Sequence, residues 1–542
     1  MPDRASDPGL LRLADAVLQP GFTGTTAPDW VRRRIAGGLG SVLLFARNTT
    51  GPAQTAALTA QLRAENPDVI VAVDEEGGDV TRLEAATGSS YPGNLALGTV
   101  DDEELTRAVA RAVGRDLAAA GITLDYAPDA DVNSNPRNPV IGVRSFGGDT
   151  ALVARHTAAW VRGLHEGGAA ACAKHFPGHG DTSVDSHHGL PVVDAGWEEL
   201  AEVALPPFRA AVDAGARAVM TAHLLLPALD PDHPATASRR VLTGLLREEL
   251  GFDGLVVTDA VEMAAVADRY GVSGAAVRAL AAGADLVCVG NRGGDRVVEE
   301  LRSAVAAAVA EGVLAEERLA EAADRVARFA AWSRKLQADA LATAGPADGT
   351  APADTAGGTG RAGRADRAGR ADRAVGLEAA RRALRVRTGG AAVPAPPAGA
   401  PHVAEFSPAA TVAVDAFTRW GVAGRLAEVL PGTTSQVLTA ADADPGPGLG
   451  TGTDTGSGTG DRVAAAAAGR PLVLVVRDAH RHAWMRDALL DLVGRRPDAV
   501  VVEMGLPGLP PCGAVHVATH GAARVCGEAA VEAVLAHLRG RP

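Results

Sequence analysis

The stretch AACAKHFPGHGDTSVDSHHGLP (170–191) joins an apolar run to a polar loop that is interrupted by glycines. Its first seven residues have the length and apolar content of a buried strand. From Lys174 onward the segment carries four of the chain's 14 histidines. A buried strand that ends in titratable side chains is typical of a parallel sheet whose site lies at the carboxyl ends of its strands.

The same pattern recurs through the first 340 residues. Six further apolar segments have strand length, and the segments between them are rich in Ala, Leu, Arg and Glu at amphipathic helical spacing. They are residues 41–45, 69–74, 123–129, 217–223, 254–259 and 284–290. Repeated β–α units in this number predict a TIM-like (β/α)₈ barrel with one irregular strand, because only seven are evident. A doubly wound open sheet is the alternative.

Four of these predicted strands end in polar residues. Asp74 closes VIVAVD, Lys174 and His175 lie near the end of AACAKHF, His223 closes RAVMTAH, and Asp259 closes GLVVTD. A single aspartate after a strand can be a helix N-cap. Four polar strand ends together instead indicate a functional site at one edge of the barrel.

The length of 542 residues and a change of composition predict two domains. We expect a catalytic barrel over 1–337, a low-complexity linker over 338–375 and a smaller α/β sandwich domain over 376–542. Strands of the last domain are expected at LRVR, HVAEFS, TSQVLT, PLVLVVRD and AVVVEMG.

Charge and composition exclude several classes of protein. The net charge is −13 and the basic residues form no run outside an Arg/Ala repeat, which argues against a nucleic-acid partner. Neither a signal-peptide pattern nor an 18-residue apolar run is present, so we expect a soluble cytoplasmic protein without a membrane partner. The four cysteines are scattered and predict neither disulfides nor a zinc knuckle. Only two of the 52 basic residues are lysines, Lys174 and Lys335, so a lysine in the polar loop suggests that its compact ammonium is needed there.

Five motifs together carry a resemblance to a known family. They are VDEEGGDVTRL (73–83), NPVIGVRSFGGD (138–149), KHFPGHGDTSVDSHHGLP (174–191), VMTAHLLLPALDP (219–231) and GLVVTDAVEM (254–263). In this order, over about 40–335, they closely resemble family 3 glycoside hydrolases of the β-N-acetylglucosaminidase (β-N-acetylhexosaminidase) branch. The resemblance implies an exo-acting, retaining hydrolase of terminal β-linked N-acetylglucosamine that needs no cofactor and no metal. Muropeptides from cell-wall recycling and chitin-type oligosaccharides both fit as substrates.

The resemblance also implies catalytic roles. Asp259 would be the nucleophile that forms a covalent glycosyl-enzyme. His187 would be the acid/base, oriented by Asp185, since an imidazole titrates near neutrality and a carboxylate can fix its tautomer. His188 is adjacent to His187, and the spacing of the DSH motif favours His187. Glycines at 178, 180 and 189 are expected to make this loop flexible.

The sugar ligands implied by the resemblance are polar residues of the same motifs. They are Asp74, Arg82, Arg144, Lys174 and His175, with His223 counted beside them. An arginine fork and a lysine point charge suit the hydroxyls of a bound sugar. Glu75 and Asp79 depart from the residues that relatives often carry, and either carboxylate can alter specificity if it faces the sugar.

Four other functions remain open. A zinc hydrolase could use His175, His179, Asp181 and His187 as ligands, although their spacing follows no standard zinc motif and we read His179 and Asp181 as loop structure. A histidine acid/base repels phosphate less than a carboxylate does, so phosphorolysis is possible. A β-glucosidase whose second domain supplies the acid, and a non-catalytic sugar-binding protein, complete the alternatives.

Overall fold

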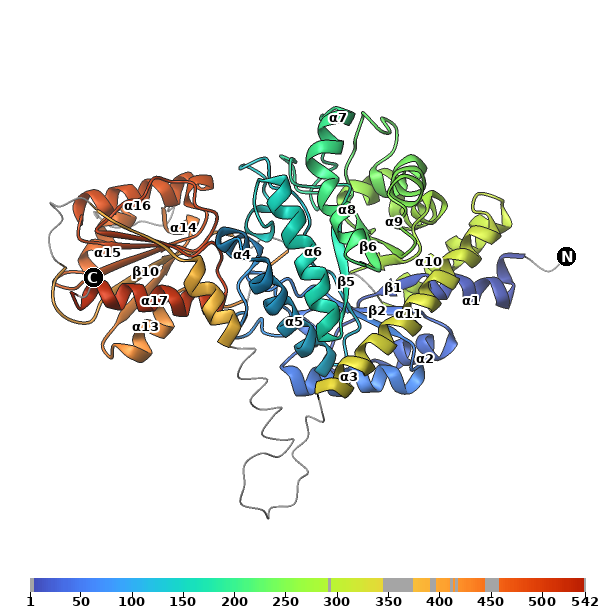
Figure 1. Cartoon of the computed structure of the whole chain (residues 1–542), viewed down its shortest axis with the longest axis horizontal. Helices are drawn as coiled ribbons and strands as arrows, with labels where there is room; N and C mark the ends of the chain where they lie inside the picture. Colours follow the sequence, from blue (N-terminus) through green and yellow to red (C-terminus); the bar gives the residue numbers. More distant parts are fainter. Residues whose placement is uncertain are drawn as a thin grey trace, which may run out of the picture. The chain divides into compact units, whose positions relative to one another are not determined.

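The computed structural model describes residues 4–290, 294–344, 374–389, 396–409, 413–414, 418–443 and 458–540. The chain forms two compact units (Figure 1). The first contains Met1–Glu76, Val80–Glu84 and Asp101–Arg373, and the second contains Gly77–Asp79, Ala85–Val100 and Ala374–Pro542. Two short pieces that follow the DEE segment therefore fold with the second unit. Of the expected linker, the first residues belong to helix α11 (Glu316–Ala344), and 345–373 lie outside the described residues.

Eight parallel strands, in a six-stranded and a two-stranded sheet, lie in the first unit. They are β1 (Leu18–Pro20), β2 (Ser41–Leu44), β3 (Ile70–Val73), β4 (Leu124–Asp125), β5 (Ala170–Phe176), β6 (Ala218–Thr221), β7 (Leu255–Thr258) and β8 (Val287–Val289). Strands β2 to β7 pair in chain order, and β1 pairs with β8. Single parallel bridges, Gly21 to Leu43 and Val257 to Leu286, join the two sheets. The sheet thus curls into a barrel-like ring, and the open-sheet alternative is wrong.

The irregular strand is β1, which the sequence analysis did not identify. Its three residues, LQP, contain a glutamine and a proline, which are unusual in a buried strand. Gln19 is fully buried, donates to Ser41 Oγ at 2.7 Å and accepts from the Tyr126 hydroxyl. These partners satisfy a polar side chain that periodicity alone would place outside.

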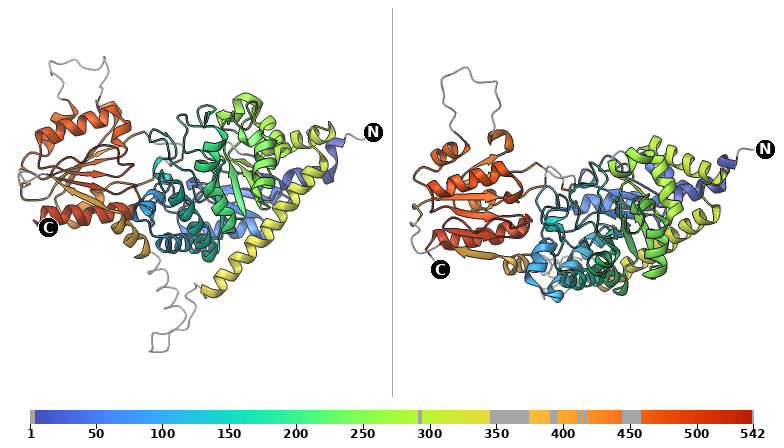
Figure 2. Two further views of the ribbon diagram at one scale, coloured as in Figure 1. Left: turned by 45° about the horizontal axis from the view of Figure 1, so that its top comes forward. Right: turned by 90° about the horizontal axis from the view of Figure 1, so that it is seen from above.

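Helices follow the strands around the barrel (Figure 2). They are α1 (Pro8–Ala16), α2 (Asp29–Gly37), α3 (Pro52–Glu65), α5 (Glu103–Ala119), α6 (Thr150–Gly167), α7 (Trp197–Glu199), α8 (Pro206–Asp213), α9 (Ala264–Ala282) and α10 (Asp295–Ala310), with α11 last, and π-helical turns at Leu200–Ala204 and Arg240–Glu249. Asp149 caps α6 by accepting from the Leu152 amide at 2.7 Å. Helices α5 and α6 pack closely, because a Cβ on Gly163 would lie 2.2 Å from the Arg107 carbonyl oxygen.

The barrel interior is filled by apolar side chains from alternate positions of the strands. Leu43, Ala72, Cys172, Met220 and Val257 belong to this core, and Val326, Phe329 and Ala330 of α11 pack against it. Because the interior is filled, polar chemistry is confined to the strand ends and the loops beyond them.

The second unit is built on a six-stranded sheet in the order β11-β10-β12-β13-β14-β9. Its strands are β9 (Arg385–Thr388), β10 (His402–Phe406), β11 (Thr434–Leu438), β12 (Leu472–Val476), β13 (Val500–Glu503) and β14 (Val515–Ala518); only β9 runs antiparallel. Separate apolar cores cover the two faces of this sheet. The packed helices are α4 (Asn94–Val100), α13 (Ala423–Val429), α14 (Ala440–Ala443), α15 (Thr459–Ala466), α16 (Ala483–Arg495) and α17 (Arg524–Leu538). Five strands lie where the sequence predicts them, and β14 was not predicted.

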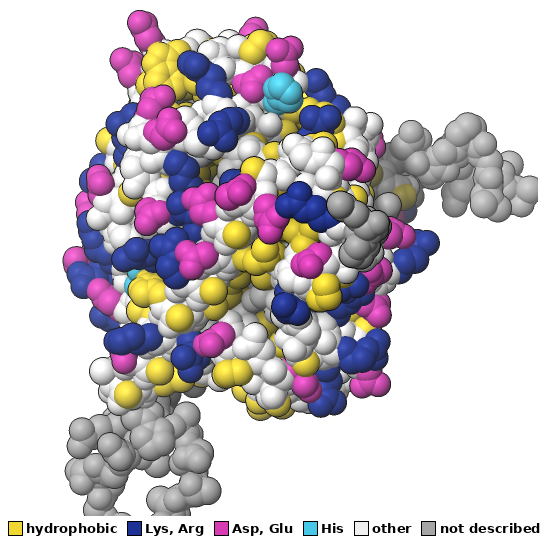
Figure 3. All heavy atoms as spheres, turned by 90° about the vertical axis from the view of Figure 1, so that its right-hand side faces the viewer, with side chains coloured by type: hydrophobic (Ala, Val, Ile, Leu, Met, Phe, Trp, Pro, Cys, Tyr) yellow, Lys and Arg dark blue, Asp and Glu magenta, His cyan; other side chains and the backbone are white. Residues whose placement is uncertain are grey.

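Surface charge and helix hydropathy bear on the expected partners. On the face drawn in Figure 3, basic and acidic side chains are interspersed. Mixed charge of this kind is unlike the basic stripe of a nucleic-acid-binding surface. Among the described helices, none is both long and apolar enough to cross a membrane.

Candidate active site

The carboxyl ends of alternate strands, β3, β5 and β7, carry predicted site residues. Asp74 follows β3, Lys174 and His175 lie at the end of β5, and Asp259 follows β7. Lys174 Nζ donates to Asp74 Oδ1 at 2.8 Å, although the two residues are 100 positions apart. Parallel strands end at one edge of the barrel, which explains why residues far apart in sequence meet there.

Asp259 is held as a carboxylate. Burial alone raises its pKa, but the charges of His223, His175 and His187, together with the Ala260 amide, lower it below the usual range. The Ala260 amide donates to Asp259 Oδ1 at 2.7 Å. An ionised, oriented carboxylate is the state that nucleophilic attack at a sugar carbon requires.

His187 and Asp185 form a hydrogen-bonded pair on the loop after β5. The distance from His187 Nδ1 to Asp185 Oδ1 is 2.8 Å, and the His187 amide donates to the same oxygen at 2.9 Å. Burial alone lowers the pKa of His187, whereas Asp185 and Asp259 outweigh burial and raise it. Burial alone raises the pKa of Asp185, but its contacts with His187 outweigh burial and lower the pKa to about 2. The neighbouring His188 is exposed.

His179 supports this loop from below. Its Nδ1 lies 2.7 Å from the Thr182 hydroxyl, and its Nε2 lies 3.3 Å from the hydroxyl of Ser186, between the two members of the pair. Burial lowers the pKa of His179 to about 4, so the ring is neutral at physiological pH. These contacts confirm that His179 bonds the loop to itself. Asp181 is exposed.

The glycines of the loop serve different purposes. A Cβ on Gly180 would lie 1.7 Å from the Val132 carbonyl oxygen, so only glycine fits there. Gly178 adopts a φ of +131°, which favours glycine. The expectation that glycines make the loop flexible is therefore incomplete: Gly180 allows close packing of the loop onto residue 132.

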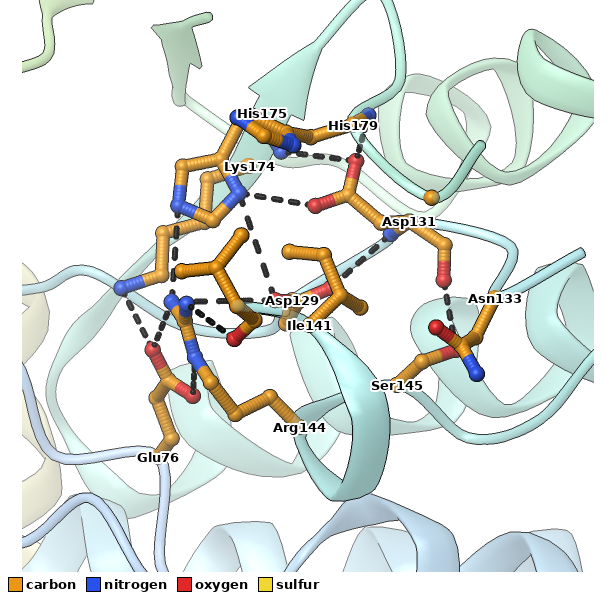
Figure 4. Close-up of polar contacts among 12 residues, drawn as sticks. Glu76, Asp129, Asp131, Asn133, Ile141, Arg144, Ser145, Lys174, His175 and His179 are labelled. Carbon is orange, nitrogen blue, oxygen red and sulfur yellow. Dashed lines mark hydrogen bonds and ion pairs between the residues drawn. The ribbon is translucent and has the colours of Figure 1, made fainter. Parts of the chain in front are cut away.

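A buried cluster of opposite charges lies beside the loop (Figure 4). Lys174 Nζ lies 2.8 Å from Asp74 Oδ1 and 2.7 Å from Glu76 Oε1. Arg144, from a short 3₁₀ turn at Gly142–Arg144, places Nη2 2.8 Å from Glu76 Oε1 and Nε 3.0 Å from Glu76 Oε2. The bidentate face of Arg144 is therefore directed at Glu76, which the sequence analysis did not single out.

His175 is oriented by a second carboxylate that was not predicted. Its Nδ1 lies 2.7 Å from Asp131 Oδ2, and its Nε2 lies 3.4 Å from Arg144 Nη2 (Figure 4). Asp131 also accepts from the His179 amide at 2.6 Å. Asp131 thus positions both the His175 ring and the start of the loop that follows β5.

Arg82 and Glu75 belong to the turn that follows Asp74. Arg82 Nη2 lies 3.9 Å from Asp74 Oδ2. The Glu75 carboxylate accepts from the Arg82 amide at 2.8 Å and from the Leu83 amide at 3.0 Å. Burial raises the pKa of Glu75 to about 7. Glu75 therefore holds the backbone of this turn.

Asp79, the other departure from the family pattern, is engaged in the second unit. Its Oδ2 lies 2.5 Å from Arg477 Nη2, and its Oδ1 accepts from the Ala522 amide at 2.6 Å. The side chain of Asp79 is 2% exposed. These two bonds explain why a carboxylate is buried at position 79, and no contact with a sugar is needed to explain it.

His223 is fully buried after β6. Its Nδ1 lies 2.8 Å from the Thr236 hydroxyl and its Nε2 lies 3.1 Å from the Ala260 carbonyl oxygen. Burial lowers its pKa, although the charge of Asp259 acts in the opposite direction. Both ring nitrogens therefore have protein partners. One of these partners, Ala260, follows Asp259 in the chain.

The potential metal ligands that lie together differ from the zinc ligands named as an alternative. Within the described ranges, the only three such residues whose ligand atoms lie within 4.8 Å of one another are Asp129, Asp131 and His175. Arg144 Nη2 lies 3.7 Å from Asp129 Oδ2, and a cation in that position opposes a metal ion. His179, Asp181 and His187 do not join this grouping.

Comparisons with known proteins show the family of this chain. The sequence profile of the glycosyl hydrolase family 3 N terminal domain matches residues 26–329. The chain belongs to glycoside hydrolase family 3. Beta-hexosaminidase of Pseudomonas aeruginosa is 39% identical over 290 residues, which are 53% of this chain and 84% of that protein. The predicted family is therefore confirmed.

Two longer relatives extend this comparison. Beta-hexosaminidase A of Pseudoalteromonas piscicida is 36% identical over 316 residues, which are 54% of this chain and 53% of that protein, so the chain matches about half of that relative's length. A solved family 3 β-N-acetylglucosaminidase from Paenibacillus sp. str. FPU-7 has a TM-score of 0.79 and 31% identity, and the match covers 98% of this chain and 97% of that one. Similarity to this family 3 structure thus includes both units.

The residues that were missed had a signal in the sequence. Asp74 and Glu76 are two positions apart in an extended segment, so their side chains share one side of it, while Glu75 faces the other. Asp129 and Asp131 have the same spacing. In both pairs the second acidic residue contacts a predicted sugar ligand.

Proposed function

We propose that this chain is a retaining β-N-acetylglucosaminidase. Asp259 attacks the anomeric carbon, and His187 protonates the departing oxygen and then deprotonates the incoming water. The observation that carries the proposal is the contact of 2.8 Å between His187 Nδ1 and Asp185 Oδ1. The charge of Asp259 also raises the pKa of His187. The Paenibacillus relative, similar over nearly the whole chain, supports N-acetylglucosamine as the sugar.

Binding of the terminal sugar is assigned to the charged cluster. Asp74, Arg82, Arg144, Lys174 and His175 are proposed to contact this sugar, because their hydrogen-bonding groups suit sugar hydroxyls. His223 has both ring nitrogens engaged, so its proposed role is to hold the Asp259–Ala260 segment. This assignment changes the role that the sequence suggested for His223.

The test is release of nitrophenol from the aryl β-N-acetylglucosaminide and from the aryl β-glucoside, each with and without phosphate. Free N-acetylglucosamine under both conditions is the expected product. A sugar 1-phosphate would identify a phosphorylase, and preference for the glucoside would identify a β-glucosidase. No release from either substrate would support a sugar-binding protein, and loss of activity on chelation would support a metal-dependent hydrolase.

A further inference from the structure

Glu76 connects two of the proposed sugar ligands. Its Oε1 lies 2.7 Å from Lys174 Nζ and 2.8 Å from Arg144 Nη2, and its Oε2 lies 3.0 Å from Arg144 Nε (Figure 4). The Glu76 side chain is 3% exposed and that of Lys174 is 2% exposed. Both cations therefore meet this carboxylate away from solvent, where charge interactions are strong.

The charges of the cluster depend on one another. Burial alone raises the pKa of Glu76, but Arg144 and Lys174 lower it far below its usual range. Burial and Arg144 lower the pKa of Lys174, but Asp74 and Glu76 outweigh them and raise it. Without Glu76, Lys174 and Arg144 would repel each other with only Asp74 beside the ammonium.

We propose that Glu76 is a positioning residue of this site, which holds Lys174 and Arg144 charged and correctly spaced for the terminal sugar. The inference rests on the proposed function for its kinetic consequence and on the contacts alone for its electrostatic one. Two N–H groups of Lys174 are directed at Asp74 and Glu76, so the direction of the third is fixed. Arg144, held by both oxygens of Glu76, in turn lies 3.4 Å from His175 Nε2.

The electrostatic part can be measured without any substrate, because the chain has only two lysines, Lys174 and Lys335. Lysine labelled with ¹³C gives two side-chain signals, and the pH at which each signal begins to titrate is compared between the variant and the wild type. Glu76→Gln, which preserves shape and removes the charge, should lower the pKa of Lys174. Lys335 is 76% exposed on the side chain and serves as the internal reference, which should not shift. An unchanged Lys174 titration would overturn the inference.

The kinetic part uses the same variant on the aryl N-acetylglucosaminide. Displacement of Lys174 and Arg144 should reduce kcat/KM about 10- to 100-fold. The factor should be the same for good and poor leaving groups, because these two residues contact the sugar and not the leaving group. In a Lys174→Met background the loss caused by Glu76→Gln should become severalfold smaller, since the two residues act as a unit. Equal losses in both backgrounds, or full activity of Glu76→Gln, would contradict the proposal.

Controls separate folding from positioning. Glu503→Gln alters an equally buried glutamate of the second unit, which accepts from the Asp478 and Gly505 amides, and should leave activity unchanged. If Glu76→Gln folds poorly, Glu76→Asp retains the charge with a shorter reach; it should keep a raised Lys174 pKa and lose activity, and wild-type kinetics from it would count against the inference. An inactive wild-type enzyme would overturn the proposed function, while the lysine titration would still decide the role of Glu76.

Discussion

The pKa values of Asp259 and Asp185 are both lowered, but by different neighbours. Asp259 owes its lowered pKa to surrounding histidine charges and a backbone amide, which outweigh burial, so it remains available to a substrate. Asp185 is committed to His187 through a side-chain and a backbone hydrogen bond. The direct partners of each carboxylate thus distinguish the proposed nucleophile, Asp259, from the proposed orienting residue, Asp185.

Substitution of the two reacting residues should have different leaving-group dependence. Asp259→Asn removes the proposed nucleophile and should abolish turnover of every substrate. His187→Ala should lower kcat about 100-fold or more on oligosaccharides, and much less on aryl glycosides whose leaving group needs no proton. Steady-state kinetics on matched substrates measures both effects; equal losses from His187→Ala on both substrates would exclude His187 as the acid.

The pH profile should report the Asp185–His187 pair. His187 must be protonated to act as an acid, so activity falls as pH rises through its raised pKa. Asp185→Asn removes a group that raises this pKa, and the alkaline limb of kcat/KM should therefore move to lower pH. His188 is exposed, so His188→Gln is the matched control, and its alkaline limb should coincide with that of the wild type. A limb that stays in place in Asp185→Asn would assign the titration to another group.

At the scale of elements, the residues of the candidate site lie on turns and loops that follow the strands. Hydrogen bonds from buried side chains stabilise the conformation of these turns and loops. The turn after β3 is held by Glu75, whose carboxylate accepts from two amides. The loop after β5 is held by His179 and Asp131. Such buried polar contacts replace the ladder of hydrogen bonds that regular elements possess.

Glu75 should make stability depend on pH in a predictable direction. Burial raises its folded pKa from 4.5 to about 7, so the native state binds the extra proton and stability falls as pH rises between these values. The full effect is about 3 kcal/mol. Glu75→Gln lacks it, so the variant should gain stability relative to wild type between pH 5 and pH 8 in urea unfolding. A constant difference would show that Glu75 does not titrate there.

At the scale of the whole molecule, the chain order and the folded units do not coincide. Gly77–Asp79 and Ala85–Val100 fold with the second unit, while Val80–Glu84, which contains Arg82, folds with the first. Asp79 is paired with Arg477 and bonded to the Ala522 amide. A motif of eleven residues thus contributes to both units.

Breaking the Asp79–Arg477 pair should destabilise the second unit. Arg477→Ala leaves a carboxylate that is 2% exposed without its guanidinium, which costs about 3 kcal/mol. Calorimetry of the full chain should show one transition shifted down in temperature. Arg486→Ala is the matched control, because its pair with Asp487 is exposed on the side chains by 41% and 66% and contributes under about 1 kcal/mol. Equal shifts in both variants would refute a special role for the buried pair.

Much of the fold could be predicted because strand periodicity and polar strand ends are local signals. Seven of eight barrel strands were found, and β1 was missed because Gln19 and Pro20 break the apolar pattern. Strand β14 was missed because His516 interrupts the apolar pattern of VHVA. Glu76 and Asp131 were missed because their partners come from distant segments, which no window along the chain contains.

The sequence by itself determined the family, the repeated β–α units and most of the residues from which the candidate site is drawn, because motif identity and strand alternation are read from consecutive residues. Only the tertiary structure decided which carboxylate meets which cation. Glu75, Glu76 and Asp79 lie within five positions and are chemically alike, yet they bond backbone amides, the Lys174–Arg144 pair and Arg477 respectively. That division depends on the direction of each side chain and on what distant strands place in front of it.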